Sequence, residues 1–413
     1  MVKHWPGGGP EEGGRDAHYN YGKYSVYPGN NLKTHLIPFT EGAFKLNGPT
    51  QCAGAVMPYY TISYGIDPSG NNVGNNFSKY IITDLLRDKY GYDGIVCTDW
   101  GVTRDNEAVE NFGGMCWGVE TLSVADRHYM ILKAGADQFG GNNDKEPVLQ
   151  AFQMGVKEFG EEAWNKRIRE SARRLLMPMF RTGLFENPYL DVDKTKEIVG
   201  NKEFMRRGYE AQVKSLVMLK NKQSVLPVSD TGKKVYIPKR HFPSVVDFFG
   251  NTTKDYYDYP VNLDLVKKYY QVVDNPEEAD FAIVFIQGPM SGTGYDVADR
   301  EKGGNGYVPI SLQYNDYTAN SARTTSIAGG DVKESFTNRS YKGKTVKTAN
   351  KDDLALVLNT RKQMKNKPVI VTLMATRPVI VGEFEKAADA IVVSFGTSNE
   401  AFLAVSYTHL RAH

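Results

Sequence analysis

A short acidic motif is the strongest sign of chemistry in this sequence. In the stretch 91–100, GYDGIVCTDW, Asp99 and Trp100 follow directly after a run of apolar residues. Such a run predicts a buried strand, and parallel α/β folds build their sites at the carboxyl ends of their strands. A carboxylate there can attack an acetal carbon, while the face of the tryptophan can pack on a sugar ring. From spacing alone, a cap on the following turn explains Asp99 equally well.

Two more groups of polar residues lie near the N-terminus. Lys3 and His4 end a predicted strand and precede WPGGGP; both can donate hydrogen bonds to hydroxyls, and the glycines let the backbone approach a ligand. Asp16 lies two residues before His18, a spacing at which a carboxylate can orient and charge an imidazole for proton transfer. A lone DxH pair is otherwise common on surfaces. Phosphate binding is an alternative function for the glycine-rich stretch, but neither GxxxxGK(S/T) nor GxGxxG within a complete strand–helix unit is present.

The charge balance excludes several classes of partner. The 413 residues include 50 Lys and Arg and 48 Asp and Glu, a net charge of +2 without an acidic or basic block. The sequence therefore lacks the charge pattern that is typical of proteins that bind nucleic acid or anionic membranes. The longest apolar runs, 281–286 and 369–374, are far shorter than the ~20 residues of a membrane helix. The sequence predicts a globular protein of two or three domains.

No metal ion or other cofactor is predicted. The cysteines, Cys52, Cys97 and Cys116, lack the CxxC spacing of a zinc or redox site, and we interpret them as small buried hydrophobes. A metal-dependent barrel hydrolase is a weak alternative, because the histidines before the C-terminal tail show neither HxH nor HxxxH spacing. These histidines are His4, His18, His35, His128 and His241.

The elements that position these residues alternate between strands and helices. In the first part of the chain we expect strands at 53–60, 94–98 and 136–139 and helices at 77–90, 126–134 and 163–181. This order predicts a parallel sheet with right-handed crossovers. A helix at 203–219 and a linker follow.

A second alternating stretch predicts a separate three-layer α/β domain. Its expected strands are 234–237, 282–286, 369–374 and 390–395, with a helix at 351–365. Residues 288–349 are rich in Gly, Ser, Thr and Asn and predict a functional loop or lid. The expected domains are 1–185, a linker at 186–232, and 233–405. Residues 406–413 have no apolar stripe and are interpreted as a non-native tail.

In their order and spacing, several motifs resemble glycoside hydrolase family 3, the β-glucosidase-like retaining enzymes. They are VKHWPGGG from residue 2, GAVMPYY from 54, GYDGIVCTDW from 91, KAGADQF from 133, RTGLFENP from 181 and EAQVKSLVMLKN from 210. The resemblance implies an α/β fold, in which the C-terminal part of a (β/α)8 TIM-type barrel is followed by an α/β sandwich. It implies hydrolysis of terminal β-glycosidic bonds, with a β-linked oligosaccharide or glycoside as substrate.

The resemblance also assigns roles to individual positions. Asp99 matches the nucleophile that forms a covalent glycosyl-enzyme. The residues expected to bind substrate are Lys3, His4, Tyr60, Met57, Trp100 and Arg104.

The acid/base residue departs from the pattern of many family members. Their loop motif SGEGYD reads SGTGYD here, with Thr293 in the place of the glutamate. The Asp16–His18 pair resembles the acid/base dyad of the family's N-acetylglucosaminidases. We favour His18, because an imidazole with a pKa near ~6.5 is already suited to proton transfer. The alternatives on the second-domain loop are Asp296, Asp299 and Glu301.

The resemblance leaves several questions open. A (β/α)8 barrel needs ~250 residues, so we expect the first half of the barrel to lie upstream of Met1 and this chain to be weakly active. β-N-acetylglucosaminidase and β-xylosidase are alternatives within the family, and a non-catalytic sugar-binding protein or inactive fragment is the alternative outside it. Compartment and oligomeric state do not follow from these residues.

Overall fold

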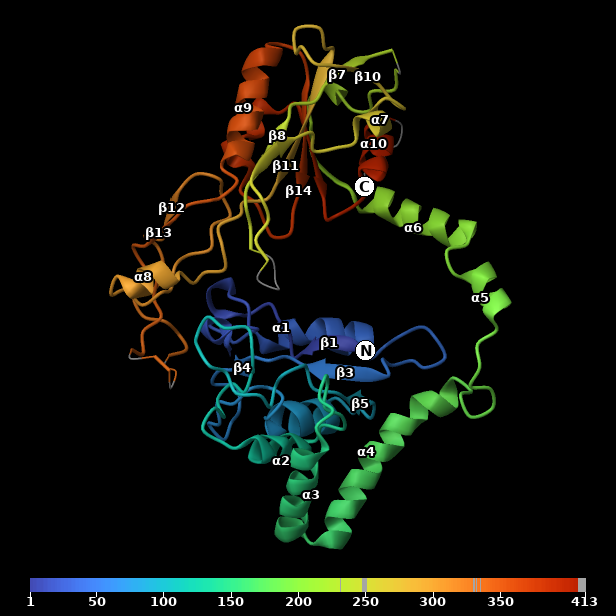
Figure 1. The fold of residues 1–413 in the computed structure, drawn as a ribbon, viewed down its shortest axis with the longest axis vertical. Helices are drawn as coiled ribbons and strands as arrows, with labels where there is room; N and C mark the ends of the chain where they lie inside the picture. The colour runs from blue at the N-terminus through green and yellow to red at the C-terminus, as the bar shows by residue number, and fades with distance from the viewer. Residues whose placement is uncertain (231, 247–250, 330, 332, 335, 408–413) are drawn as a thin grey trace. The chain divides into compact units, whose positions relative to one another are not determined.

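The computed structural model describes residues 1–230, 232–246, 251–329, 331, 333–334 and 336–407 (Figure 1). The chain forms two compact units. Unit 1 comprises Met1–Tyr189 together with Thr293–Pro309 and Ala319–Lys344, and unit 2 comprises the other segments. No helix in the described ranges is long and apolar enough to cross a membrane.

A short parallel sheet lies in unit 1, with the strand order β1-β3-β5 among the described residues. The strands are β1 (Val2–Trp5), β3 (Ala55–Pro58) and β5 (Ile95–Val96). Lys3 is paired with Met57, so the ends of β1 and β3 are aligned. The strand expected at 136–139 is reduced to one parallel bridge between Cys97 and Gln138. A separate parallel pair joins β2 (Tyr24–Ser25) to β4 (Ile62–Ser63).

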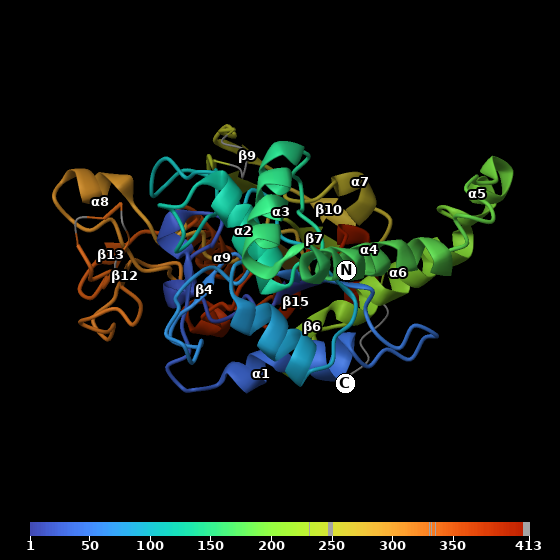
Figure 2. The same ribbon diagram turned by 90° about the horizontal axis from the view of Figure 1, so that it is seen from below.

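Unit 1 also contains helices. They are α1 (Leu32–Ile37), α2 (Val124–Ala134), α3 (Lys145–Phe159), α4 (Glu161–Arg181) and α8 (Val297–Glu301). The helix expected at 77–90 is a π-helix at Tyr80–Lys89. Ser123 and Asp144 cap α2 and α3 by accepting backbone amides, as N-cap side chains do. Figure 2 shows α2 beside α3, and their contact buries Leu132, Ala151 and the α4 residue Trp164.

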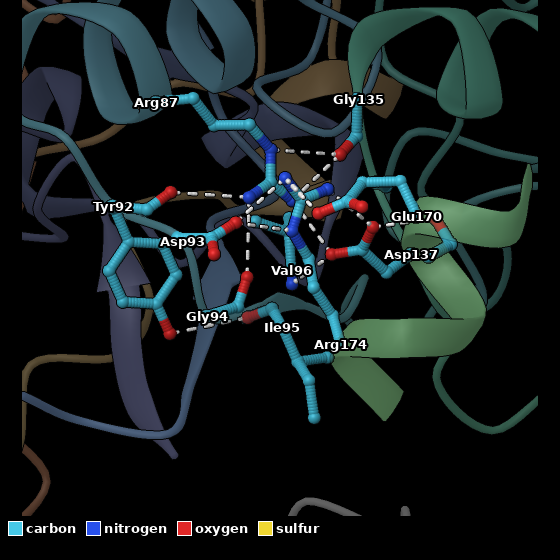
Figure 3. A network of polar contacts seen from close by, with 12 residues as sticks. Arg87, Tyr92, Asp93, Gly94, Ile95, Val96, Gly135, Asp137, Glu170 and Arg174 are labelled. Atoms are coloured by element: carbon cyan, nitrogen blue, oxygen red, sulfur yellow. Dashed lines mark hydrogen bonds and ion pairs between the residues drawn. The ribbon is translucent and has the colours of Figure 1, made fainter. Parts of the chain in front are cut away.

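A buried carboxylate ties α4 to the sheet of unit 1 (Figure 3). Asp137 accepts hydrogen bonds from the Val96 amide at 2.9 Å and from Ser171 Oγ at 2.6 Å. Arg87 reaches the same carboxylate at 2.7 Å and Arg174 at 3.3 Å. Because each charge has charged and neutral hydrogen-bond partners, burial is tolerated here, whereas removal of the carboxylate would leave the Arg87 guanidinium without its ion-pair partner.

In unit 2, a larger sheet has the strand order β10-β7-β11-β14-β15-β6 among the described residues. The strands are β6 (Val217–Asn221), β7 (Lys234–Tyr236), β10 (Gln271–Val273), β11 (Phe281–Gln287), β14 (Val369–Met374) and β15 (Ala390–Ser394). All neighbours are parallel except β6, which pairs antiparallel with β15. Short antiparallel pairs join β8 (Arg240–Phe242) to β9 (Tyr256–Asp258) and β12 (Tyr317–Thr318) to β13 (Thr345–Val346).

Helices cover both faces of this sheet. On one face α9 (Asp352–Met364) packs through Leu354 and Val357 on alternate residues of β11. On the other face, α7 (Leu263–Val266) and α10 (Asn399–Tyr407) pack on the intervening residues. Figure 1 shows α9 opposite α7 and α10. Two covered faces explain why the run 281–286 is continuously apolar.

Two expectations are corrected around these helices. The helix expected at 203–219 is α6 (Lys202–Ser215), which is preceded by α5 (Val192–Ile198), and the residues that follow form β6 because they can pair with β15. Ser406 and Tyr407, interpreted as tail residues, belong to α10, where the buried Ser406 hydroxyl donates to the Leu403 carbonyl. The expected tail residues 408–413 lie outside the described residues.

The long loop at 288–349 is divided between the two units. Residues 293–309 and 319–344, here called the insertion, pack in unit 1 although their flanks belong to unit 2. Arg300 forms an ion pair with Glu110 at 2.8 Å, and Asn20 donates to Asp331 at 2.8 Å. The expected second domain, 233–405, included all of the insertion.

Candidate active site

Asp99 lies just beyond β5, and its two carboxylate oxygens have different partners. Oδ1 accepts hydrogen bonds from the Tyr60 hydroxyl and from the Trp100 amide, each at 2.8 Å. Oδ2 lies 3.1 Å from Nε2 of His4. The residue is 5% exposed. Oδ1 is therefore fixed by the protein, and Oδ2 faces the imidazole of His4.

These partners keep Asp99 ionised. Burial alone would raise the pKa of Asp99, but hydrogen bonds from His4, the Trp100 amide and Tyr60 lower it below its usual value. Burial and the nearby charge of Asp99 raise the pKa of Tyr60, so Tyr60 stays a neutral donor. An ionised carboxylate held at one oxygen has the form that a nucleophile needs.

Lys3 and His4 line a cavity of about 390 Å³. The Lys3 side chain is exposed, and the His4 ring lies 5.0 Å from that of Tyr59. Met57 is buried in β3, paired with Lys3. The other lining residues are Val2, Gly7, Gly8, Gly9, Thr34, His35, Pro38, Phe39 and Ala43. The cavity thus combines a cation, an imidazole and open backbone next to the Asp99 carboxylate.

Trp100 is supported by two glycines and remains 52% exposed. The Gly140 amide donates to Thr98 Oγ1 at 2.8 Å, and a Cβ on Gly141 would overlap the Trp100 indole. Arg104 is exposed and lines a second cavity of about 300 Å³ with Thr98 and His128. Asp99 itself lines neither cavity; its neighbours do.

The Asp16–His18 pair forms in the structure and lies beside Tyr60, the hydrogen-bond partner of Asp99. His18 Nδ1 is 2.6 Å from Asp16 Oδ1, which also accepts the His18 backbone amide at 2.9 Å. The His18 ring packs edge-on against Tyr60, with 5.0 Å between ring centroids. Tyr60 therefore touches both the predicted nucleophile and the predicted acid/base.

The electrostatics of this pair favour a protonated imidazole. Burial lowers the pKa of His18, but the hydrogen bond and charge of Asp16 and the charges of Asp99 and Glu11 raise it above 6.5 overall. Burial raises the pKa of Asp16, and the hydrogen bonds from His18 outweigh this and lower it. His18 can therefore hold a proton near neutral pH, as a general acid must.

The insertion holds the segment that carries this pair. Arg15 is 2% exposed, and its Nε donates to the Gly294 carbonyl at 3.0 Å. Its guanidinium stacks on Tyr307 at 4.8 Å and on Tyr341 at 5.0 Å. The sequence predicted a lid or functional loop here. In the structure the insertion contacts Arg15 and so supports the segment that carries Asp16 and His18.

The alternative acid/base residues are bonded within the insertion. Asp296 caps α8 by accepting the Ala298 amide at 2.9 Å. Asp299 accepts Lys344 Nζ at 2.5 Å and the Gly306 amide at 2.8 Å. Glu301 is exposed at the end of α8, and Thr293 is exposed.

Sequence reasoning missed Glu11. Its carboxylate is half-buried and accepts a hydrogen bond from the Tyr59 hydroxyl. Burial and the charge of Asp16 raise the pKa of Glu11 to about 7, while Tyr59, the Ala17 amide and His18 act in the opposite direction. The signal was the acidic pair Glu11–Glu12 between the glycines and the DxH motif. No group of three or more His, Cys, Asp or Glu side chains that could hold a metal ion occurs within the described part of the chain.

Two sequence profiles of one family match the chain. The profile of the glycosyl hydrolase family 3 N terminal domain matches residues 1–177, and that of its C-terminal domain matches residues 216–406. Together they cover most of the sequence.

Curated relatives are similar over nearly the whole chain. Beta-glucosidase C of Emericella nidulans is 33% identical over 411 residues, which are 98% of this chain and 54% of the relative. The periplasmic beta-glucosidase/beta-xylosidase of Dickeya chrysanthemi is 29% identical, over 98% of this chain and 52% of the relative. The chain spans about half the length of these curated relatives.

Solved structures with a similar fold include two enzymes. A mutant exo-1,3/1,4-beta-glucanase from a Pseudoalteromonas species aligns with a TM-score of 0.62 at 21% identity, covering 98% of this chain and 57% of that one. The beta-glucosidase from Listeria innocua in complex with isofagomine aligns with a TM-score of 0.58 at 15% identity, covering 96% and 48%. The shared fold is α/β. With the two profiles, these findings show that the chain belongs to glycoside hydrolase family 3.

Proposed function

We propose that this chain carries the catalytic residues of a retaining glycosidase that hydrolyses terminal β-glycosidic bonds. The observation that carries the proposal is the ionised Asp99 carboxylate at a strand end, fixed by Tyr60 and the Trp100 amide and faced by His4. Relatives named as beta-glucosidases and beta-xylosidase support this reaction class. The three-stranded sheet corresponds to later strands of a (β/α)8 barrel, and unit 2 to an α/β sandwich.

The reaction proceeds in two displacements. Asp99 Oδ2 attacks the anomeric carbon while the bond to the leaving oxygen breaks, and that oxygen takes a proton from His18. The neutral imidazole then removes a proton from water, whose oxygen attacks the same carbon and releases Asp99. His18 ends the cycle protonated, so atoms and protons balance.

Substrate contacts follow from the side chains around Asp99. Lys3 and His4 donate to sugar hydroxyls, and the exposed Trp100 offers an apolar face for a sugar ring. Arg104 lies on the rim of the neighbouring cavity, while Met57 supports the strand that carries Tyr60. Glucosides, xylosides and N-acetylglucosaminides all present such hydroxyls.

A sugar-binding protein without hydrolytic activity is the second candidate function. The observation that favours it is Thr293, an exposed residue where many family members carry the acid/base glutamate. Because threonine cannot protonate a leaving group near neutral pH, such a protein would have to lack a working His18 as well.

Covalent trapping separates the two candidates. A 2,4-dinitrophenyl 2-deoxy-2-fluoro-glycoside needs no acid catalysis and reports only nucleophilic attack, so labelling is informative even when turnover is slow. We expect mass spectrometry to find one added fluoroglycosyl group on Asp99, with glucosyl and xylosyl reagents compared. Asp99→Asn should abolish labelling, and the exposed-site control Glu107→Gln should retain it. An unmodified wild-type chain with intact sugar binding would instead establish the binding protein.

A further inference from the structure

Glu11 has no part in the mechanism above, yet it lies against the machinery that performs it. The Tyr59 hydroxyl donates to Glu11 Oε1, and the Tyr59 ring is 7% exposed. That ring lies 5.0 Å from His4, whose Nε2 faces Asp99. The neighbouring Glu12 has a different task, because its Oε1 accepts the Ile327 amide of the insertion at 2.6 Å.

Tyr59 and Tyr60 each hold one carboxylate. They follow β3 consecutively, and their ring centroids are 6.2 Å apart. Tyr60 donates to Asp99 and Tyr59 to Glu11, so two acidic side chains are fixed from one short segment. His18 packs on Tyr60, which places the imidazole on the same tyrosine pair.

The charges of Glu11 and His18 influence each other's pKa. Tyr59, at the end of β3, donates to the Glu11 carboxylate, and the Ala17 amide, next to His18 in the chain, also lowers the pKa of Glu11 by hydrogen bonding. The pKa of His18 is raised by the hydrogen bond and charge of Asp16 first, and then by the charges of Asp99 and Glu11. A negative charge at Glu11 therefore stabilises the imidazolium, and the imidazolium stabilises that charge.

We propose that Glu11 is a positioning residue for proton transfer, whose carboxylate, held by Tyr59, adds to the support that Asp16 gives to the protonated form of His18 that serves the leaving group. Glu11 contacts neither sugar nor leaving oxygen in this role. Its own pKa of about 7 makes the support grow as the pH rises through neutrality. Without it, the imidazole would lose its proton at a lower pH.

The proposal rests on the proposed function for its catalytic meaning, but its test does not need turnover. Nuclear magnetic resonance of the His18 ring protons gives the pKa of His18 in the wild-type chain and in Glu11→Gln. We expect Glu11→Gln to lower that pKa by about half a unit or more. Tyr59→Phe removes the bond that favours the Glu11 carboxylate, so it should lower the pKa of His18 in the same direction by less. Glu107→Gln, at an exposed site, should leave it unchanged.

Activity provides the second readout. The alkaline limb of kcat/KM on an aryl glycoside with a poor leaving group should move to lower pH in Glu11→Gln by the same amount. An unchanged His18 titration in Glu11→Gln, or an equal shift in Glu107→Gln, would overturn the inference. A shifted titration in a chain that is never labelled at Asp99 would leave the inference standing and reject the glycosidase instead.

Discussion

At the residue scale, Asp99 suits the proposed role of nucleophile because three donors converge on its buried carboxylate. The Tyr60 hydroxyl lies 2.8 Å from Oδ1 and 2.9 Å from the Trp100 carbonyl oxygen, and its raised pKa keeps its proton in place across the working pH range. The Trp100 amide contributes the second bond to Oδ1. The same tyrosine ring packs on His18, so one side chain contacts both the proposed nucleophile and the proposed acid/base.

Removing this hydroxyl should move the acid limb of the pH profile. Asp99 has a lowered pKa, so its ionised form is present above that pKa and is lost as the pH falls through it. In Tyr60→Phe one bond to the carboxylate is gone, and we expect the pKa of Asp99 and the acid limb of kcat/KM to rise by about one unit. The measurement is kcat/KM across the range from about pH 3 to about pH 7. An acid limb that stays in place would mean that Tyr60 does not set the ionisation of Asp99.

Some of these residues could be found from the sequence and others could not. Asp99 could, because an apolar run ending in a carboxylate marks a strand end, and the Asp16–His18 pair is local. Glu11 is harder to find, because the acidic pair Glu11–Glu12 does not show which residue binds it: its partner Tyr59 lies 48 positions away, and only the folded chain brings them together.

At the element scale, the turn at Gly22 packs closely against the backbone of the Asp16–His18 pair. Gly22 lies in a buried turn, and a Cβ there would overlap the carbonyl oxygen of Asp16. Arg15, next to Asp16 in the chain, contacts Gly294, Tyr307 and Tyr341 of the insertion. The continuous apolar run at 281–286 predicted β11, but no sequence pattern showed that the insertion would pack in unit 1, because these contacts join side chains far apart in the chain.

A matched pair of glycine variants tests this close packing. Gly22→Ala should displace Asp16 and thereby His18, which lowers kcat/KM by about 100-fold for a glycoside with a poor leaving group. A dinitrophenyl glycoside, which needs little protonation, should lose much less. Gly29→Ala is the control, because a Cβ at Gly29 meets only the Asn31 side chain at 3.9 Å. Equal losses on both substrates would show that Gly22 supports the fold rather than proton transfer.

At the scale of the whole molecule, two separate cores each contain a buried ion pair. Asp137 is surrounded by arginines in unit 1, and Asp353 accepts Arg240 at 2.6 Å and 2.8 Å in unit 2. The α/β class of both units could be predicted from their alternating strands and helices. The packing between segments could not, because it depends on contacts between residues far apart in the chain, such as that of Arg15 with Gly294.

These two pairs give independent reporters of unfolding. Because breaking a buried pair from one side costs about 3–5 kcal/mol, Asp137→Asn should lower the melting temperature of unit 1 and Asp353→Asn that of unit 2. Calorimetry should show two transitions, with each variant shifting a different one. Asp93→Asn is the control, because Asp93 is an exposed partner of Arg173 and Arg174 and should cost less than about 1 kcal/mol. Because the insertion packs in unit 1, we expect it to unfold with unit 1. A shift of both transitions by Asp137→Asn would mean that the two units unfold cooperatively.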